Sequence, residues 1–304
     1  MSRPPDNPRQ IQSRSLIGYL LVLAATAIWS GNFIVARALT DSVPPVTLAF
    51  FRWLVALIVL LPFGIGPMSR NIRVIRKHLV YLSITGFLVV TIFNTLVYIA
   101  ARTSNTLNLT LIAICSPIFI VMFARLFLGD TLTYRRIVGL VTATFGVLLL
   151  ITQGNLSRLI SLTFSEGDVW MLISAALFGV YSILVRIKPS DLRPVVFLCS
   201  TFIIGLIFLV PWVVWELRDV EVIKFSSTVI AAIVYLGIGP SLLAYLCWNK
   251  AIMIIGPVRT AVVYYSLPLF SGTEALLLLG EPVHAVHILS GVLILMGVIV
   301  ATRE

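Results

Sequence analysis

The segment SLPLFSGTEALLLLGE, residues 266–281, has a second copy earlier in the chain, SPIFIVMFARLFLGDT at residues 116–131. The copies are offset by 151 residues, so that Pro117 matches Pro268. The other matches at this offset are Phe119 with Phe270, Gly129 with Gly280, and Asp130 with Glu281. Each copy is an apolar run with a proline near its start and a glycine–acid pair at its end. Two such copies, half a chain apart, predict a protein built from a duplicated unit.

The composition excludes an ordinary water-soluble protein. Of the 304 residues, 59% are hydrophobic and 11% are charged, and the mean hydropathy is +1.06. Soluble domains carry roughly 25% charged residues. Apolar runs long enough to cross a bilayer, which takes about 20 helical residues, recur along the whole chain. Transmembrane β-strands are shorter, about 10 residues, and alternate in polarity. The sequence therefore predicts an all-α polytopic membrane protein.

The apolar runs predict ten transmembrane helices. We expect them at residues 16–39, 44–66, 79–101, 106–128, 134–152, 168–187, 194–215, 228–249, 258–280 and 285–302. Residues 1–15 are polar and contain prolines and arginines, which predicts a disordered cytosolic tail. The first apolar run is longer than the core of a signal peptide, about 7–15 residues, so we expect it to be retained as a span.

Basic residues set the orientation of the chain, because Lys and Arg accumulate in cytoplasmic loops. With the N-terminus inside, 16 Lys and Arg residues fall on the inner side and 5 on the outer side. Both termini are therefore predicted to be cytoplasmic. The same distribution explains the net charge of +10. Nucleic-acid binding would instead need a basic face exposed to solvent, so we expect no nucleic-acid partner.

The duplication extends over residues 16–152 and 168–302. Gly86 matches Gly237 at the offset of 151 residues, and Pro45 matches Pro194 at an offset of 149. Each repeat then holds five spans. Because five is odd, the second repeat enters the membrane from the opposite face, as in transporters with inverted repeats.

These features resemble the EamA branch of the drug/metabolite transporter superfamily. The resemblance is carried by AIWSGNFIVARAL (27–39), by PPVTLAFFRWLVA (44–56) and by the two segments quoted first, and it covers the chain apart from its tail. In size and character the chain is similar to the YddG type of amino-acid exporter. The resemblance implies a multi-pass exporter of amino acids or other metabolites in the bacterial inner membrane. It places a cavity between spans 1–4 and 6–9, with spans 5 and 10 peripheral. Its motifs do not name a substrate.

Two charged residues lie deep within predicted spans. Arg52 lies eight residues into the second span, about 12 Å along the helix, and Glu274 lies about 9 Å from the outer end of the ninth. A charge at such depth faces water or a partner and marks a functional candidate. We expect Arg52 and Glu274 to form an ion pair or to share a polar cavity. A structural arginine, a proton-carrying glutamate and a merely cavity-lining glutamate are the alternatives. Phe123 occupies the position of Glu274 in the first repeat, so the acid breaks the symmetry.

Polar and aromatic side chains recur at helical spacing within the spans. A solute with polar ends and an apolar body would bind to such a lining, although aromatic stripes also serve as packing or interfacial belts. With Arg52 and Glu274, the candidates for the substrate pathway are Trp29, Asn32, Thr91, Asn94, Tyr98, Tyr181, Ser241, Tyr245, Trp248, Tyr264 and Ser271.

Several residues inside the spans weaken a helix. Proline removes a backbone hydrogen bond, and transporters place broken helices beside their binding sites. Static kinks that shape the packing are the alternative. The candidate hinges are Pro117, Gly237, Gly239, Pro240 and Pro268.

The remaining residue patterns exclude several functions. Cys115, Cys199 and Cys247 lie in apolar runs without a Cys/His cluster, so we expect neither a metal site nor a disulfide framework, and no cofactor. No buried catalytic set and no P-loop are present, which argues against an enzyme and against direct use of ATP. We expect a monomeric secondary transporter that exports amino acids, including aromatic and hydrophobic ones, by alternating access. The alternatives are a multidrug or other metabolite transporter of the same superfamily, and an intramembrane enzyme or structural membrane protein.

Overall fold

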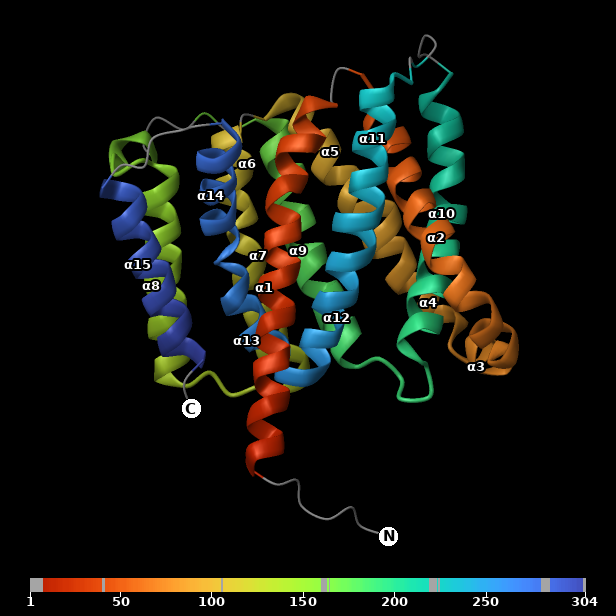
Figure 1. Cartoon of the computed structure of the whole chain (residues 1–304), viewed down its shortest axis with the longest axis horizontal. Helices are drawn as coiled ribbons and strands as arrows, with labels where there is room; N and C mark the ends of the chain where they lie inside the picture. The colour runs from red at the N-terminus through yellow and green to blue at the C-terminus, as the bar shows by residue number, and fades with distance from the viewer. Residues whose placement is uncertain are drawn as a thin grey trace.

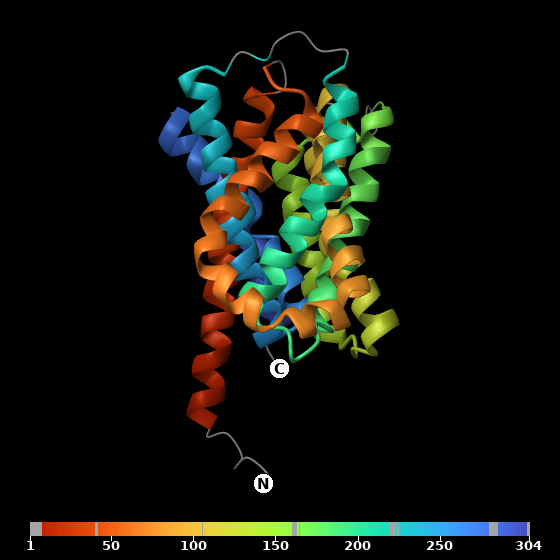
Figure 2. The same ribbon diagram turned by 90° about the vertical axis from the view of Figure 1, so that its right-hand side faces the viewer.

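The computed structural model describes residues 8–39, 42–104, 106–159, 163, 165–218, 223, 225–279 and 285–302. In these residues the chain is helical, and its long helices run side by side along one axis (Figures 1 and 2). Nine stretches of the described chain are long and apolar enough to cross a membrane. The prediction of an all-α polytopic membrane protein is confirmed.

The first half of the chain contains α1 (Pro8–Ala38), α2 (Pro45–Arg70), α3 (Ile72–Lys77), α4 (Leu79–Gly86), the π-helix η1 (Phe87–Phe93), α5 (Asn94–Thr103), α6 (Thr106–Ala113), α7 (Cys115–Leu128) and α8 (Tyr134–Ile151). A short 3-10 helix, η2 (Leu156–Leu159), follows. The second half contains α9 (Glu166–Arg186), α10 (Pro194–Glu216), α11 (Ser227–Leu236), the π-helix η3 (Gly237–Leu243), α12 (Ala244–Ile255), α13 (Pro257–Tyr264), α14 (Leu267–Leu279) and α15 (Ala285–Thr302).

The helix α1 includes part of the predicted tail. It is described from Pro8 onward, so the prediction of disorder was wrong for residues 8–15. Proline is favourable in the first turn of a helix, and no further proline or glycine interrupts the chain before the apolar run. Residues 1–7 lie outside the described residues. We call the end of the bundle at which α1 begins and α15 ends the terminal end, and the opposite end the distal end (Figure 1).

The segment predicted as the ninth span, 258–280, consists of two helices. α13 and α14 are separated at Tyr265, shortly before Pro268, which has no N–H to continue the backbone hydrogen bonds of α13. The equivalent span of the first half breaks between α6 and α7 at Ile114, shortly before Pro117. The hydroxyl group of Tyr265 donates a hydrogen bond of 3.4 Å to the carbonyl oxygen of Ile114. The two breaks occupy matching positions and touch, which is expected where inverted repeats meet at their axis.

The third and eighth spans each contain a π-helical segment, η1 and η3, at matching places. The matched glycines Gly86 and Gly237 lie at their starts. A Cβ on Gly237 would lie 2.5 Å from the Val55 side chain, and one on Gly86 would lie 2.7 Å from the carbonyl oxygen of Thr201. These close approaches let α2 pack on η3 and α10 pack on η1, so that each half of the chain contacts the π segment of the other.

At the distal end, Glu216 of α10 caps the first turn of α2. Its Oε1 accepts a hydrogen bond of 3.0 Å from the backbone N–H of Val46. Its Oε2 accepts bonds of 2.7 Å from the N–H of Thr47 and 2.8 Å from the Thr47 hydroxyl. Free N–H groups and the helix dipole both favour a negative charge at a helix start. Glu216 therefore joins the two halves of the chain.

Replacing Glu216 by alanine is expected to lower the free energy of unfolding by about 1–3 kcal/mol, the range for a lost cap and for donors left unpaired. Thermal unfolding of the purified protein in detergent measures the effect. Glu166→Ala is the control, because Glu166 is exposed and its carboxylate accepts a bond from Trp170 of its own helix. Equal melting temperatures for the two variants would show that the cap does not join the halves.

At the terminal end, Asp191, in the connection between α9 and α10, bridges to the first half. One carboxylate oxygen lies 3.1 Å from Nζ of Lys77 and the other lies 3.0 Å from Nε2 of His78. The hydrogen bonds from His78 and from Lys77 lower the pKa of Asp191 below its ordinary value. Asp191 is therefore ionised at neutral pH and remains available for both contacts.

Candidate functional site

Arg52 lies in the second turn of α2 and is 1% exposed. A guanidinium group removed from water costs at least a few kcal/mol unless its donors are satisfied. Its Nε donates a hydrogen bond of 2.6 Å to Oγ of Ser241, and its Nη1 donates bonds of 3.0 Å to Oδ1 of Asn94 and 3.3 Å to Oδ1 of Asn32. Nη1 also donates to the hydroxyl of Tyr98. All four acceptors are neutral, so they solvate the charge without neutralising it.

The two π segments position two of these acceptors. The hydroxyl of Ser241, in η3, donates a bond of 2.8 Å to the carbonyl oxygen of Leu236. Nδ2 of Asn94, directly after η1, donates a bond of 3.1 Å to the carbonyl oxygen of Val89. Both side-chain bonds reach back five residues, the same spacing as the backbone bonds of a π-helix, and π segments are frequent at functional sites. Each side chain donates a hydrogen bond to a backbone carbonyl oxygen of its own span. Its oxygen atom then accepts a hydrogen bond from Arg52.

No carboxylate of the described residues forms an ion pair with Arg52. Nη2 of its guanidinium group has no hydrogen-bond partner among those residues. Arg52 lines a small cavity of about 40 Å³, together with Trp29, Asn94 and Phe178. A buried cation with an unused donor at a cavity wall is suited to an anion, and arginine binds carboxylates especially well.

Arg52 and Glu274 do not form the expected ion pair. Glu274 belongs to α14, where its side chain meets α1, and its Oε1 lies 2.6 Å from Oγ of Ser30. α14 packs against α1, so similar depth in the membrane does not bring the side chains of Arg52 and Glu274 to the same place.

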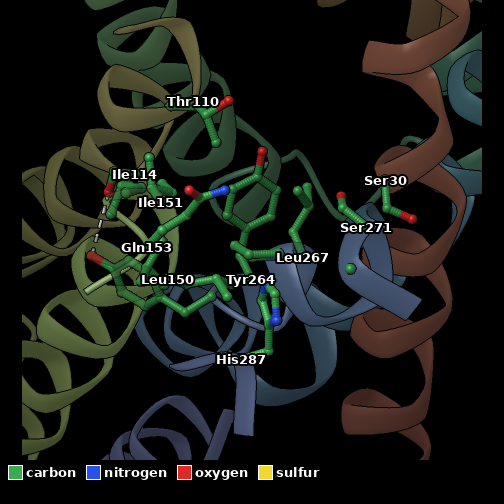
Figure 3. Close-up of a pocket in the computed structure, with 15 residues that line it drawn as sticks. Ser30, Thr110, Ile114, Leu150, Ile151, Gln153, Tyr264, Leu267, Ser271 and His287 are labelled. Atoms are coloured by element: carbon green, nitrogen blue, oxygen red, sulfur yellow. Dashed lines mark hydrogen bonds between the residues drawn. The ribbon is translucent and has the colours of Figure 1, made fainter. Parts of the chain in front are cut away.

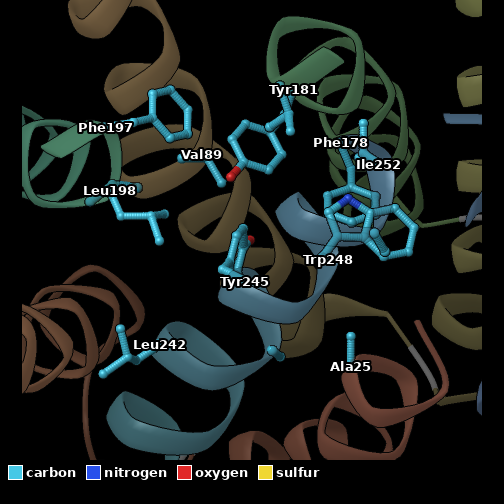
Figure 4. Packing of buried hydrophobic residues seen from close by; sticks show 14 of the residues in the cluster. Ala25, Val89, Phe178, Tyr181, Phe197, Leu198, Leu242, Tyr245, Trp248 and Ile252 are labelled. Atoms are coloured by element: carbon cyan, nitrogen blue, oxygen red, sulfur yellow. The ribbon is translucent and has the colours of Figure 1, made fainter. Parts of the chain in front are cut away.

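An aromatic cluster lies in the hydrophobic core, and Figure 4 shows Phe178, Tyr181, Tyr245 and Trp248 of it. The ring of Trp29 has four aromatic neighbours, with centroids 5.3–6.1 Å away. Its Nε1 donates a hydrogen bond of 2.9 Å to the carbonyl oxygen of Pro240 in η3. The hydroxyl of Tyr181 donates a bond of 2.8 Å to Oδ1 of Asn249. The four neighbours of Trp29 are Phe178, Tyr245, Trp248 and Tyr264. Four of these rings, those of Trp29, Phe178, Tyr245 and Tyr264, also line the small cavity at Arg52.

A larger cavity of about 340 Å³ lies beside the small one, and Ala113 and Tyr264 line both (Figure 3). Its volume is in the range of small-molecule sites, about 300–1,000 Å³. Apolar side chains of α8 and α14 form much of its wall, and Ser30 and Ser271 are among its polar groups. It extends toward the distal end, to Gln153 after α8 and His287 in α15. The fifth and tenth spans pack against each other at one edge of the bundle (Figure 1), but they also border this cavity.

The structure brings most of the predicted pathway residues into two groups. Around Arg52 lie Asn32, Asn94, Tyr98 and Ser241, and the aromatic cluster contains Trp29, Tyr181, Tyr245, Trp248 and Tyr264. Ser271 lines the larger cavity. Thr91 lies apart from the site, because its hydroxyl donates a bond of 2.8 Å to the carbonyl oxygen of Gly205 in α10.

The sequence did not single out Phe178 or Ser30 as candidates. A phenylalanine in an apolar span looks like ordinary packing, and the role of Ser30 depends on its partner Glu274. Of the predicted hinges, Gly237, Gly239 and Pro240 lie in η3, and Pro117 and Pro268 lie beside the two helix breaks. A hinge function for them stays a prediction.

Comparison with known proteins places these observations in a family. The chain is 25% identical to the uncharacterized transporter YyaM of Bacillus subtilis, over 93% of each chain. It is 26% identical to an uncharacterized transporter of Archaeoglobus fulgidus, over 94% of this chain and 97% of that one. It is 24% identical to a probable terminal-alkyne amino-acid exporter of Streptantibioticus cattleyicolor, over 94% of this chain and 93% of that one.

The fold and the two halves of the sequence agree with these relatives. A solved crystal structure superposes with a TM-score of 0.74 over 95% of this chain and 96% of that chain, at 21% sequence identity, which supports the fold alone. The EamA-like transporter family matches the chain twice, at residues 16–152 and 165–303. The chain therefore belongs to the EamA-like transporter family, as the resemblance in the sequence predicted.

Proposed function

We propose that this multi-pass membrane transporter exports amino acids with apolar or aromatic side chains by alternating access. The observation that carries the proposal is the buried guanidinium group of Arg52, which has neutral hydrogen-bond partners and lines a cavity. A substrate carboxylate would supply the missing negative charge and accept a hydrogen bond from Nη2. Charge-assisted bonds of this kind are about twice as strong as neutral ones.

The surrounding side chains suit the rest of such a substrate. The cavity of about 40 Å³ at Arg52 has room for a water molecule but not for a whole amino acid. Tyr264 forms the wall between it and the larger, mostly apolar cavity. We infer that the carboxylate binds at Arg52, that the ring of Tyr264 turns aside, and that the apolar side chain extends into the larger cavity.

We propose that the chain crosses a bacterial inner membrane ten times, with both termini in the cytoplasm. The start of α1 and the end of α15 lie at the same end of the bundle, which supports an even number of crossings. The distal end then faces the periplasm. The larger cavity extends toward the distal end, so we assign this conformation to an outward-facing state.

The charge at the site weighs against the multidrug alternative. A transporter of organic cations needs an acidic group at its binding site, and the charged residue that lines the small cavity is an arginine. Amino acids also agree with the printed name of the Streptantibioticus relative, an amino-acid exporter.

Counterflow in proteoliposomes tests the proposal. Vesicles preloaded with an unlabelled amino acid should take up the same labelled amino acid faster than protein-free vesicles. Uptake should be fastest for leucine, phenylalanine and tryptophan, because their side chains match the apolar cavity, and slower for lysine and glutamate. Absence of exchange for every amino acid in the panel would rule out the proposed substrate class.

A further inference from the structure

Glu274 has no role in the binding of the substrate proposed above. It lies in α14, and its side chain meets Ser30 and Gly31 of α1 and approaches Tyr235 of α11. A Cβ on Gly31 would collide with the Tyr235 hydroxyl and would lie 3.8 Å from Oε2 of Glu274. Glycine at position 31 therefore leaves the room in which the carboxyl group and the tyrosine approach α1 from two sides.

The hydroxyl group of Ser30 connects Glu274 to the backbone of α1. Oγ of Ser30 lies 2.6 Å from the carbonyl oxygen of Ala27 and 2.6 Å from Oε1 of Glu274. Its single hydrogen is shared between these two oxygens or given to one of them. A serine hydroxyl both donates and accepts, so it can pass a proton to the carboxyl group that it contacts.

The second carboxyl oxygen of Glu274, Oε2, is buried and has no hydrogen-bond partner among the described residues. None of the Lys, Arg and His residues described forms an ion pair with Glu274. The groups that face it are the hydroxyls of Ser30 and Tyr235, and the Tyr235 hydroxyl donates to the carbonyl oxygen of Ile28 at 3.4 Å. Burial of an unpaired carboxylate costs far more than burial of a neutral carboxyl group.

We propose that Glu274 is a proton-binding site that couples export of the substrate to entry of a proton. Ser30 also lines the larger cavity, so its hydroxyl group connects that cavity with Glu274. When the carboxylate takes up a proton, a hydronium ion in the cavity gives a proton to Oγ of Ser30 and becomes water, while the Ser30 hydroxyl gives its own hydrogen to Oε1. The O–H bond of the serine is restored, and the proton ends on Glu274.

The coupling would run through α1 and rests on the proposed function. Asn32 accepts a hydrogen bond from Arg52, and two residues earlier Ser30 contacts Glu274. Residues two apart in an α-helix point about 200° apart, so α1 presents one face to the substrate site and the other to the proton site. A movement of α1 that releases one ligand would therefore disturb the other.

Glu274→Gln tests this site, because glutamine resembles the protonated acid and cannot release a proton. In proteoliposomes with an imposed pH gradient, the wild-type protein should accumulate labelled amino acid against its concentration gradient. The variant should lose this accumulation and keep counterflow, which needs no net proton movement. Glu166→Gln, on the distal surface, is the matched control and should behave as the wild type. Full gradient-driven accumulation by Glu274→Gln would overturn the proposal.

Infrared spectroscopy gives a second readout that needs no substrate. The difference spectrum between acidic and alkaline buffer should show the carbonyl band of a protonated carboxyl group in the wild type and in Glu166→Gln. Other carboxyl groups add to this band, so Glu274→Gln should lose only the component that belongs to Glu274, which subtraction of its spectrum from that of the wild type isolates. An identical band in all three proteins would refute the proton site, even if Glu274→Gln had lost all transport. If the wild type exchanged no amino acid, the proposed substrate class would be wrong. The infrared result would still show whether Glu274 binds a proton.

Discussion

Replacing Arg52 by glutamine is expected to reduce amino-acid counterflow by about 30-fold to more than 1,000-fold at substrate concentrations below saturation. Removal of one partner of a buried, hydrogen-bonded charge pair costs about 2–5 kcal/mol of binding free energy, and each 1.4 kcal/mol is tenfold in affinity. The pair is the guanidinium group of Arg52 with the carboxylate of the substrate. The glutamine amide still offers donors to the nearby oxygens of Asn94 and Ser241, which favours correct folding.

Initial rates over a range of substrate concentrations measure this effect. The apparent KM of Arg52→Gln should be higher than that of the wild type. The KM of Arg52→Lys should lie between these two values, because an ammonium group keeps the positive charge but lacks the planar pair of donors of a guanidinium group. Arg102→Gln is the control, because Arg102 is exposed at the distal end of α5. A wild-type KM in Arg52→Gln would show that the arginine has only a structural role.

Replacing Gly297 by valine is expected to lower the free energy of unfolding by about 3 kcal/mol or more, at the upper end of the range for overpacked cores. A Cβ at this position would lie 2.5 Å from the backbone nitrogen of Ala143 and 2.6 Å from the carbonyl oxygen of Gly139, both in α8. Backbone atoms cannot rotate away as a side chain can. Small residues allow membrane helices to approach closely, so the valine should separate α15 from α8.

The melting temperature in detergent and elution from a sizing column measure this loss. Gly66→Val is the matched control, because a Cβ at Gly66 meets no atom within 4 Å. The melting temperature of Gly297→Ala should lie between those of the wild type and Gly297→Val. A Gly297→Val protein as stable as Gly66→Val would contradict the close packing of the two helices.

The ends of several helices could be predicted from the sequence. α10 begins at Pro194 and α15 covers Ala285–Thr302, both as expected from the apolar runs. A span that must cross the hydrocarbon core has a fixed minimum length, and the polar residues beside it fix its ends. The family could be predicted for the same reason, because the repeat and the quoted motifs are properties of the sequence itself.

The breaks and the π segments could not be placed from the sequence. Pro117 and Pro268 marked places where a helix could bend or end. Tertiary contacts such as that of Tyr265 with Ile114 decide between these two outcomes. Gly86 gave no sign of a π segment, since a glycine in a span also serves close packing.

The composition of the site was therefore easier to predict than its contacts. Asn94 and Ser241 were candidates for the pathway, yet their convergence on Arg52 depends on η1 and η3. The sequence showed that Glu274 departs from the repeat, because the matching residue of the first half is Phe123. Its contact with Ser30 depends on the packing of α14 against α1, which cannot be derived from the depth of the residue in its span.

The central claim is that Arg52 binds the carboxylate of the substrate, and competition tests it most directly. Labelled phenylalanine counterflow would be measured against unlabelled phenylalanine and against phenethylamine, which has the same ring and amine but no carboxylate. We predict that phenylalanine competes strongly and that phenethylamine competes weakly. In Arg52→Gln, the residual transport should no longer distinguish the two competitors. Equal competition by phenethylamine in the wild-type protein would contradict the account.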